Sequence, residues 1–191
     1  YEKILKVQPG NPLALNNLAD LLAERFNQVE DARPHALKAR QIVPEDPSVA
    51  DTLGWIEYRR GQYADALRLV TEASLKLGEV PEVQYHLGMT YYMMGQEAPA
   101  RAALQLAVGA TKEFHGKSVA RDYLAMLEVD SGKVDDGAIR ALEQRRKEAP
   151  GDVIALTRLG TAYEVQGSYE KAQEALEAAL KLNPQSVPVL S

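Results

Sequence analysis

The chain has 191 residues, of which 46% are hydrophobic and 26% are charged, so it can bury a substantial core. Its net charge of −5 and the lack of a cluster of Lys and Arg argue against nucleic acid as a partner. The absence of cysteine excludes disulfides, thiolate metal sites and cysteine nucleophiles. No apolar run approaches the roughly 18 residues that a membrane helix needs, so we expect membrane contact only through an anchor outside this chain.

Proline and glycine recur along the chain with a nearly constant period. Pro9 and Pro44 are 35 residues apart, and Pro150 and Pro184 are 34 apart. A residue that tolerates a left-handed turn stands within each period: Asn27, Gly61, Gly95, Gly132 and Gly167. Such a residue ends one helix, and a proline after the next helix prevents that helix from continuing. The period therefore predicts a series of helix pairs.

In chain order, the helical spacing of apolar residues predicts five helix pairs and no sustained strand. The predicted helices are 12–26 and 30–43, 47–60 and 63–77, 81–94 and 97–112, 118–131 and 134–149, and 152–166 and 169–182. Asn11 and Asp46, each followed by proline, and also Asp152 are predicted to cap first helices.

Small residues recur where the two helices of a pair must approach closely. On the first helices these are Gly54, Gly88, Ala125 and Gly160, and on the second helices Ala32, Ala66, Ala100, Ala138 and Ala172. The pattern predicts close packing within every pair, including the fourth.

These positions together resemble the tetratricopeptide repeat (TPR), whose unit combines Leu-Gly and Tyr on one helix with Ala and Pro on and after the next. The last unit matches best, through Leu159, Gly160, Tyr163, Ala172 and Pro184. The fourth unit matches least, because Arg145 replaces a small residue and the approach at 110–117 is about three residues too long. The resemblance implies an all-α, right-handed α-solenoid of about five repeats, as a fragment of a longer array.

The resemblance also implies how the chain is divided. Residues 1–11 would be the tail of a preceding repeat helix, and 185–191 the start of a further helix or a tail. The five repeats would span 12–46, 47–80, 81–117 with a long exit loop, 118–151, which is irregular, and 152–184.

A finer resemblance concerns the stretches 16–22, 51–55 and 85–88, which look like those of long bacterial TPR proteins of the cell envelope. Among these are the lipoproteins that accompany exosortase and exopolysaccharide systems. The resemblance implies a bacterial assembly scaffold, and it favours the periplasm or a membrane-tethered position over the cytoplasm.

In the TPR family the first helices line the concave side of the solenoid, which implies that a protein or peptide partner binds there. The groove residues implied in this chain are Asn16, Asp20, Asp51, Trp55, Tyr58, Arg59, Tyr85, Met89, Tyr92, Met93 and Met126. We expect Trp55, Tyr85 and Tyr92 to be exposed in an aromatic and Met-rich floor. The alternative is that these side chains pack between neighbouring repeats.

The predicted function is therefore a non-catalytic scaffold for protein–protein interaction, without a cofactor. Two alternatives remain open: a structural module that associates with its own copies, and a regulatory domain of a larger enzyme.

Two sequence features could suggest a nucleotide-binding loop or a metal site, but neither has the spacing that such a site needs. The sequence Gly116-Lys117-Ser118 resembles the end of a P-loop, but Thr111 stands where the first glycine is needed and the segment follows a helix. We expect an inter-repeat loop in which Ser118 caps the next helix. The three histidines have no metal-ligand spacing.

Overall fold

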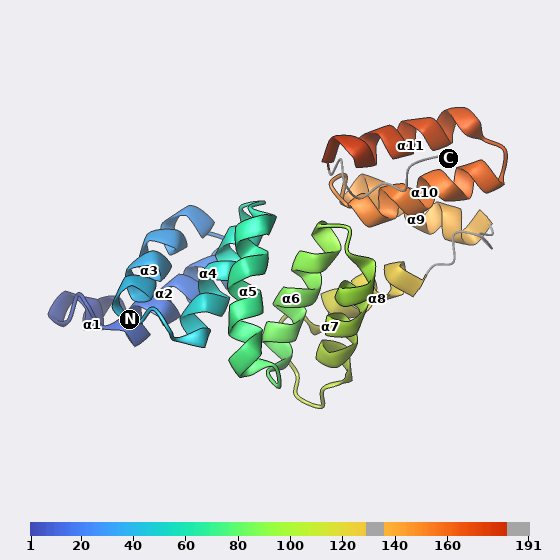
Figure 1. The fold of residues 1–191 in the computed structure, drawn as a ribbon. Coiled ribbons are helices and arrows are strands. Elements are labelled where there is room, and N and C mark those ends of the chain that lie inside the picture. The colour runs from blue at the N-terminus through green and yellow to red at the C-terminus, as the bar shows by residue number, and fades with distance from the viewer. Residues whose placement is uncertain (129–135, 183–191) are drawn as a thin grey trace.

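The computed structural model describes residues 1–128 and 136–182, and this part of the chain contains helices and no strands. The helices follow one another as stacked pairs from the N-terminal to the C-terminal end of the molecule (Figure 1). They are α1 (Glu2–Val7), α2 (Pro12–Glu24), α3 (Val29–Ile42), α4 (Pro47–Arg59), α5 (Tyr63–Leu77), α6 (Pro81–Met93), α7 (Glu97–Gly109), α8 (Lys117–Glu128), α9 (Asp136–Glu148), α10 (Val153–Val165) and α11 (Tyr169–Leu182).

The predicted helices are confirmed to within three residues at each end that the structure describes. The predicted start of a further helix at 185–191 lies outside the described residues. Within the described ranges, none of the helices combines the length and the apolar character needed to cross a bilayer. Helix α8 begins at Lys117, so Ser118 lies inside this helix and is not its cap.

The predicted caps form at the starts of three first helices. The side-chain oxygen of Asn11 accepts a hydrogen bond of 2.9 Å from the backbone N–H of residue 14. Asp46 accepts one of 2.8 Å from the N–H of Ser48, and Asp152 accepts one of 2.9 Å from the N–H of Ala155. These bonds satisfy helix donors that have no partner within the helix itself.

The turns inside the pairs also form as predicted. Asn27 has a φ of 55°, and Gly61, Gly95 and Gly167 have φ values of 76°, 71° and 75°. This left-handed conformation costs glycine little, and asparagine tolerates it better than most residues. The fifth predicted turn residue, Gly132, lies outside the described residues.

Three pairs are closed by contact between a glycine and a large side chain of the facing helix. A Cβ on Gly54 would lie 2.7 Å from the nearest side-chain atom of Val70. The corresponding distances are 2.7 Å for Gly88 and Leu104, and 2.5 Å for Gly160 and Leu176. Atoms do not approach this closely without displacement, so the helices could not pack as they do with a larger residue there.

The fourth pair is different, and the prediction of close packing within it is wrong. Helix α8 packs against α7, whereas α9 packs against α10, and α8 and α9 make no extensive contact with each other. Ala125 is exposed as a result. On α9, Ile139 and Leu142 are buried in a cluster with residues of α10 and α11 instead. Figure 1 shows α9, α10 and α11 gathered at the C-terminal end of the array.

Candidate functional site

A groove runs along the face formed by the first helices of the first three repeats, α2, α4 and α6, beside the loop 110–116. It consists of two adjoining hollows of about 410 and 310 Å³, which share Glu24, Tyr85, His115 and Gly116 as lining residues. We call the larger one the acidic hollow, because it is lined by the carboxylates of Asp20, Glu24, Asp51 and Glu82. The smaller one is the aromatic hollow, lined by Trp55, Tyr58, Tyr85, Met89 and Tyr123.

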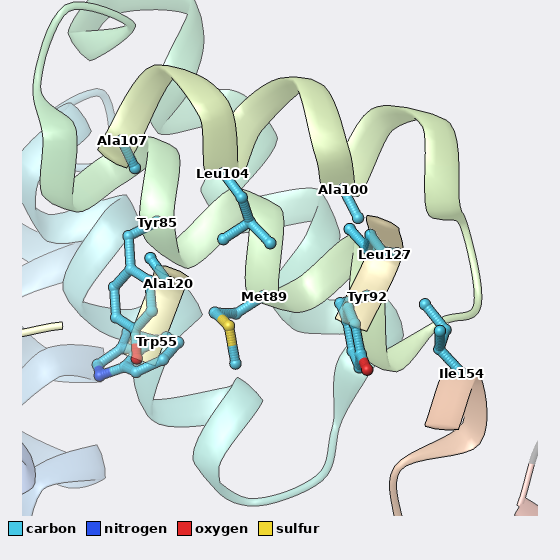
Figure 2. Close-up of a cluster of buried hydrophobic side chains, with 10 residues drawn as sticks. All are labelled: Trp55, Tyr85, Met89, Tyr92, Ala100, Leu104, Ala107, Ala120, Leu127 and Ile154. Atoms are coloured by element: carbon cyan, nitrogen blue, oxygen red, sulfur yellow. The ribbon is translucent and has the colours of Figure 1, made fainter. Parts of the chain in front are cut away.

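The expectation that Trp55, Tyr85 and Tyr92 are exposed in the groove is wrong. Trp55 and Tyr85 are each 7% exposed, and Tyr92 is completely buried. Figure 2 shows why: Trp55 and Tyr85 lie against each other, and Tyr92 lies farther along the same cluster, next to Ile154. The large side chains therefore fill the space between repeats, and only their edges reach the hollows.

Trp55 is fixed on both sides. Its indole N–H donates a hydrogen bond to the carboxylate of Glu24 on the preceding first helix. Its ring is stacked on Tyr58, with centroids 4.5 Å apart, and on His86, with centroids 4.2 Å apart. Because His86 belongs to α6 and Glu24 to α2, the ring stack and the hydrogen bond together connect three successive repeats and form a rigid wall between the two hollows.

Arg59 strengthens the same connection one helical turn farther along α4, at its C-terminal end. Its guanidinium donates to the backbone carbonyl of Ala23 and to the side chain of Asn27, and lies 3.4 Å from the carboxylate of Glu24. Arg59 thus satisfies acceptors at the C-terminal end of α2, where a positive charge also interacts favourably with the helix dipole.

His86 and Asp51 form an ion pair inside the acidic hollow. The Nδ1 atom of His86 lies 3.0 Å from both carboxylate oxygens of Asp51. Burial by itself would lower the pKa of His86, but the charge and hydrogen bond of Asp51, with the charges of Glu24 and Asp20, raise it above 6.5. The imidazole therefore favours its charged form more strongly here than in water.

Asp20 is the carboxylate of the acidic hollow that forms no ion pair. No ion pair or hydrogen bond involves its side chain within the part of the chain that the structure describes. Partial desolvation and then the negative charge of Glu24 raise its pKa; the charge of His86 opposes this, and Asp51 and Glu82 raise the pKa by smaller amounts. The hollow thus carries an excess of negative charge.

The loop 110–116 builds one wall of the groove, which the repeat pattern of the sequence did not predict. A Cβ on Gly116 would lie 2.2 Å from the ring of Tyr85, so glycine is required for this approach. The ring of Phe114 packs against the same tyrosine ring, with centroids 5.7 Å apart. The sequence features that could have indicated this wall are the extra length of the loop and its aromatic residue, Phe114.

Lys117 holds this loop in place. It is buried, and its ammonium donates to the carbonyl of Ala110 at 2.7 Å and to Glu113 at 2.8 Å. Lys117 thus binds its own loop, and the segment that resembles a P-loop offers no phosphate cradle.

Beyond the groove, the start of α10 docks on α6 and α8. The buried carboxylate of Asp152 accepts a hydrogen bond of 3.1 Å from the hydroxyl of Tyr92 and one of 2.8 Å from the Nε of Arg145. The guanidinium of Arg145 lies over the ring of Tyr123, 4.2 Å from its centroid, and Tyr123 meets Tyr92 edge to face. We call these four residues the docking cluster.

The predicted groove residues therefore fall into distinct places. Those that line the two hollows are Asp20, Asp51, Trp55, Tyr58, Arg59, Tyr85 and Met89. Asn16 lines a smaller hollow next to the acidic one, and Met93 lines a separate hollow between the turn at 61–65 and the start of α10. Tyr92 and Met126 pack within the interior and line none of these hollows. No group of three or more His, Asp or Glu residues in the described ranges is placed to hold a metal ion.

Comparison with known proteins agrees with this architecture. Models of the tetratricopeptide repeat match residues 1–47 and 52–113, and again 153–186. The chain belongs to the tetratricopeptide repeat family. It is thus a helical-repeat scaffold of the class that serves protein interaction, which is consistent with the groove on its first helices.

Individual relatives are more distant or cover only part of the chain. A segment of 85 residues, or 44% of this chain, is 40% identical to the TPR repeat-containing protein PA4667 of Pseudomonas aeruginosa. This segment spans only 14% of the length of that protein.

Two solved structures share the fold over nearly the whole chain. YrrB, described as a TPR protein with an unusual peptide-binding site, is 23% identical, with a TM-score of 0.56 over 96% of this chain and 92% of its own. MamA is 22% identical, with a TM-score of 0.52 over 90% of this chain and 91% of its own.

Proposed function

We propose that this chain holds a segment of a partner protein, extended or helical, in the groove formed by α2, α4, α6 and the loop 110–116. The observation that carries the proposal is the continuity of the two hollows across three successive repeats. A continuous groove of this kind fits a peptide segment better than it fits a compact metabolite, because side chains of alternating character can enter neighbouring hollows.

The rigidity of the groove also supports binding. The wall between the hollows is fixed by the stack of Trp55 on His86 and by the bond from Trp55 to Glu24. A preformed wall lowers the entropic cost of association, because few side chains must become ordered when the partner arrives. The half-buried rings of Tyr58 and Tyr123 offer apolar contact to the partner in the aromatic hollow.

The test must avoid the buried aromatic residues, because their truncation would leave cavities and destabilise the chain. Ser48 is exposed at the second position of α4 and lines the acidic hollow, so Ser48→Tyr places a ring in the groove without changing the charge. Ser118 is exposed at the second position of α8 and lines neither hollow. Ser118→Tyr is therefore the matched control.

Partner capture by the full-length protein, from an extract of its own source, would compare these variants. We expect Ser48→Tyr to lose the partner and Ser118→Tyr to keep it, with both variants folded by circular dichroism. Retention of the partner by folded Ser48→Tyr would contradict the proposal.

The alternative function, association between copies of the chain, is tested on the same purified protein. Mass measurement in solution across a dilution series would detect it, since a self-associating module dissociates on dilution. The placement of the protein in a bacterial envelope stays a prediction of the sequence resemblance.

A further inference from the structure

The charges around the acidic hollow are unevenly balanced. Four carboxylates line it, from α2, α4 and the start of α6, whereas the basic groups on its wall are Arg25, His86 and His115. His86 is committed to Asp51, and no described salt bridge joins Arg25 to any of the four carboxylates. The hollow therefore presents negative charge to whatever occupies it.

The carboxylates differ in how far they are already satisfied. Glu24 accepts the indole N–H of Trp55 and lies near Arg59, and Asp51 is paired with His86. Glu82 lies 3.8 Å from the exposed ammonium of Lys112. Asp20 has no such partner among the described residues, so it is the carboxylate that an incoming cation would meet first.

A second observation, independent of charge, points to a ligand at the same place. Asn16 lies one helical turn before Asp20 on α2, and it is only 8% exposed. Its side-chain Oδ1 is buried and has no hydrogen-bond partner. Asn16 and Ser48 line a hollow of about 230 Å³, and Ser48 also lines the acidic hollow, so the two spaces adjoin. A buried acceptor without a donor is unfavourable, so a shift of the Asn16 side chain toward the hollow that gained an N–H donor from a ligand would be favoured.

We propose that the acidic hollow binds a Lys or Arg side chain of the partner segment, and that an N–H of the same segment hydrogen-bonds to Asn16. This inference rests on the proposed function, because it names the chemistry of the segment that the groove holds. The cation lies among Asp20, Glu24 and Glu82, where its charge replaces the missing counter-charge.

The remaining walls of the hollow suit the rest of such a side chain. Tyr85 and Phe114 line it on the side of the loop, with ring centroids 5.7 Å apart. The methylene stem of Lys or Arg packs well on aromatic rings, and the charged end interacts favourably with the ring faces. A residue next to it in the segment then reaches the aromatic hollow, which shares Tyr85 as a wall.

Selection of random displayed peptides on the immobilised protein tests the inference without knowledge of the partner. Binding of the recovered peptides is then measured through the fluorescence of Trp55, the only tryptophan in the chain and part of the groove wall. The charge variant is Asp20→Asn with Glu82→Gln. Its matched control is Asp31→Asn with Glu170→Gln, which removes two exposed carboxylates of second helices outside the groove.

We expect the recovered peptides to be enriched in Lys or Arg and to bind the charge variant about tenfold more weakly than the wild type, while the control changes little. The affinity for the wild type should fall as salt is added, because the pair lies in partly solvated surroundings.

Other outcomes separate the failure of this inference from the failure of the proposed function. Neutral or acidic peptides that bind the wild type but not Ser48→Tyr would overturn the charge preference and leave the groove as the binding site. Peptides that bind Ser48→Tyr as well as the wild type, or no enrichment at all, would overturn both proposals.

Discussion

Asp152 offers a test of how the C-terminal repeat is attached, because one buried carboxylate performs three roles there. It caps α10, accepts the hydroxyl of Tyr92 and pairs with Arg145. Asp46 performs only the first of these roles for α4 and is exposed. The two residues are equivalent in the repeat, so substitution of each by alanine separates the docking cluster from the cap.

The loss of a cap costs about 1 kcal/mol, which is what we expect for Asp46→Ala. Asp152→Ala also leaves Tyr92 and Arg145 without their acceptor. Each buried group left unsatisfied costs about 1–3 kcal/mol. The side chain of Arg145 is 18% exposed, so water compensates part of this loss. We therefore expect a total near 3 kcal/mol for Asp152→Ala, or ~2 kcal/mol more than for Asp46→Ala.

Amide hydrogen exchange followed by mass spectrometry measures these costs locally, which matters in a repeat array whose parts can open separately. A loss of ~3 kcal/mol should speed exchange in α10 by about 100-fold, whereas Asp46→Ala should speed exchange in α4 by about fivefold. Asp152→Asn keeps an acceptor but loses the charge, and we expect an intermediate effect. Equal effects of the two alanine substitutions would refute the account of the docking cluster.

Three further predictions concern the groove itself. Gly116→Ala should lower the free energy of unfolding by about 1–3 kcal/mol, because its Cβ would clash with the ring of Tyr85. Gly109→Ala is the control, because its Cβ would meet no atom within 4 Å and should cause no such loss. Urea denaturation compares the two variants. The raised pKa of His86 means that its pairing with Asp51 contributes fully below pH 6.5 and less as the pH rises through the folded-state pKa. The difference in stability between wild type and His86→Gln should therefore narrow as the pH rises above 6.5, and a widening difference would disprove the pairing. The raised pKa of Asp20 means that its negative charge destabilises the fold. Asp20→Asn should therefore raise the free energy of unfolding by about 0.5 kcal/mol at neutral pH, and this gain should be lost below pH 3.8. A loss of stability at neutral pH would contradict this prediction.

The local features of the fold were predictable because each depends on a few neighbouring residues. A cap such as Asn11 and a turn residue such as Gly95 act through their own backbone surroundings, so their chemistry is visible in the sequence. The glycines at close helix contacts, such as Gly88, follow from the same repeat pattern.

The arrangement of the fourth repeat was not predictable in the same way. Periodicity shows which face of a helix is apolar, but not which neighbour covers that face. Ala125 carries the small residue of the pattern and is nevertheless exposed, because α9 lies on α10 instead. The sequence did signal that the fourth repeat is unusual, because Arg145 replaces a small residue of the repeat pattern. In the structure this arginine is part of the docking cluster.

The candidate groove differs in character from what the sequence implied. Most of the implied groove residues do line the two hollows, yet Trp55 and Tyr85 are largely buried between repeats. The contact between their rings, which are tilted by 54° with centroids 5.2 Å apart, depends on the distance between successive first helices, which a sequence pattern does not contain. The groove exposes its carboxylates most distinctly, and the proposed preference for a basic side chain of the partner depends on them.

The most direct test of the central claim is site-specific photo-crosslinking in the full-length protein in its own cells. A photoreactive side chain replaces Ser48 in the groove or, in the matched control, Ser118 outside it. We expect a discrete cross-linked partner from position 48 that is absent from position 118. The same adduct from both positions, or none from position 48, would contradict the claim that the groove holds a partner segment.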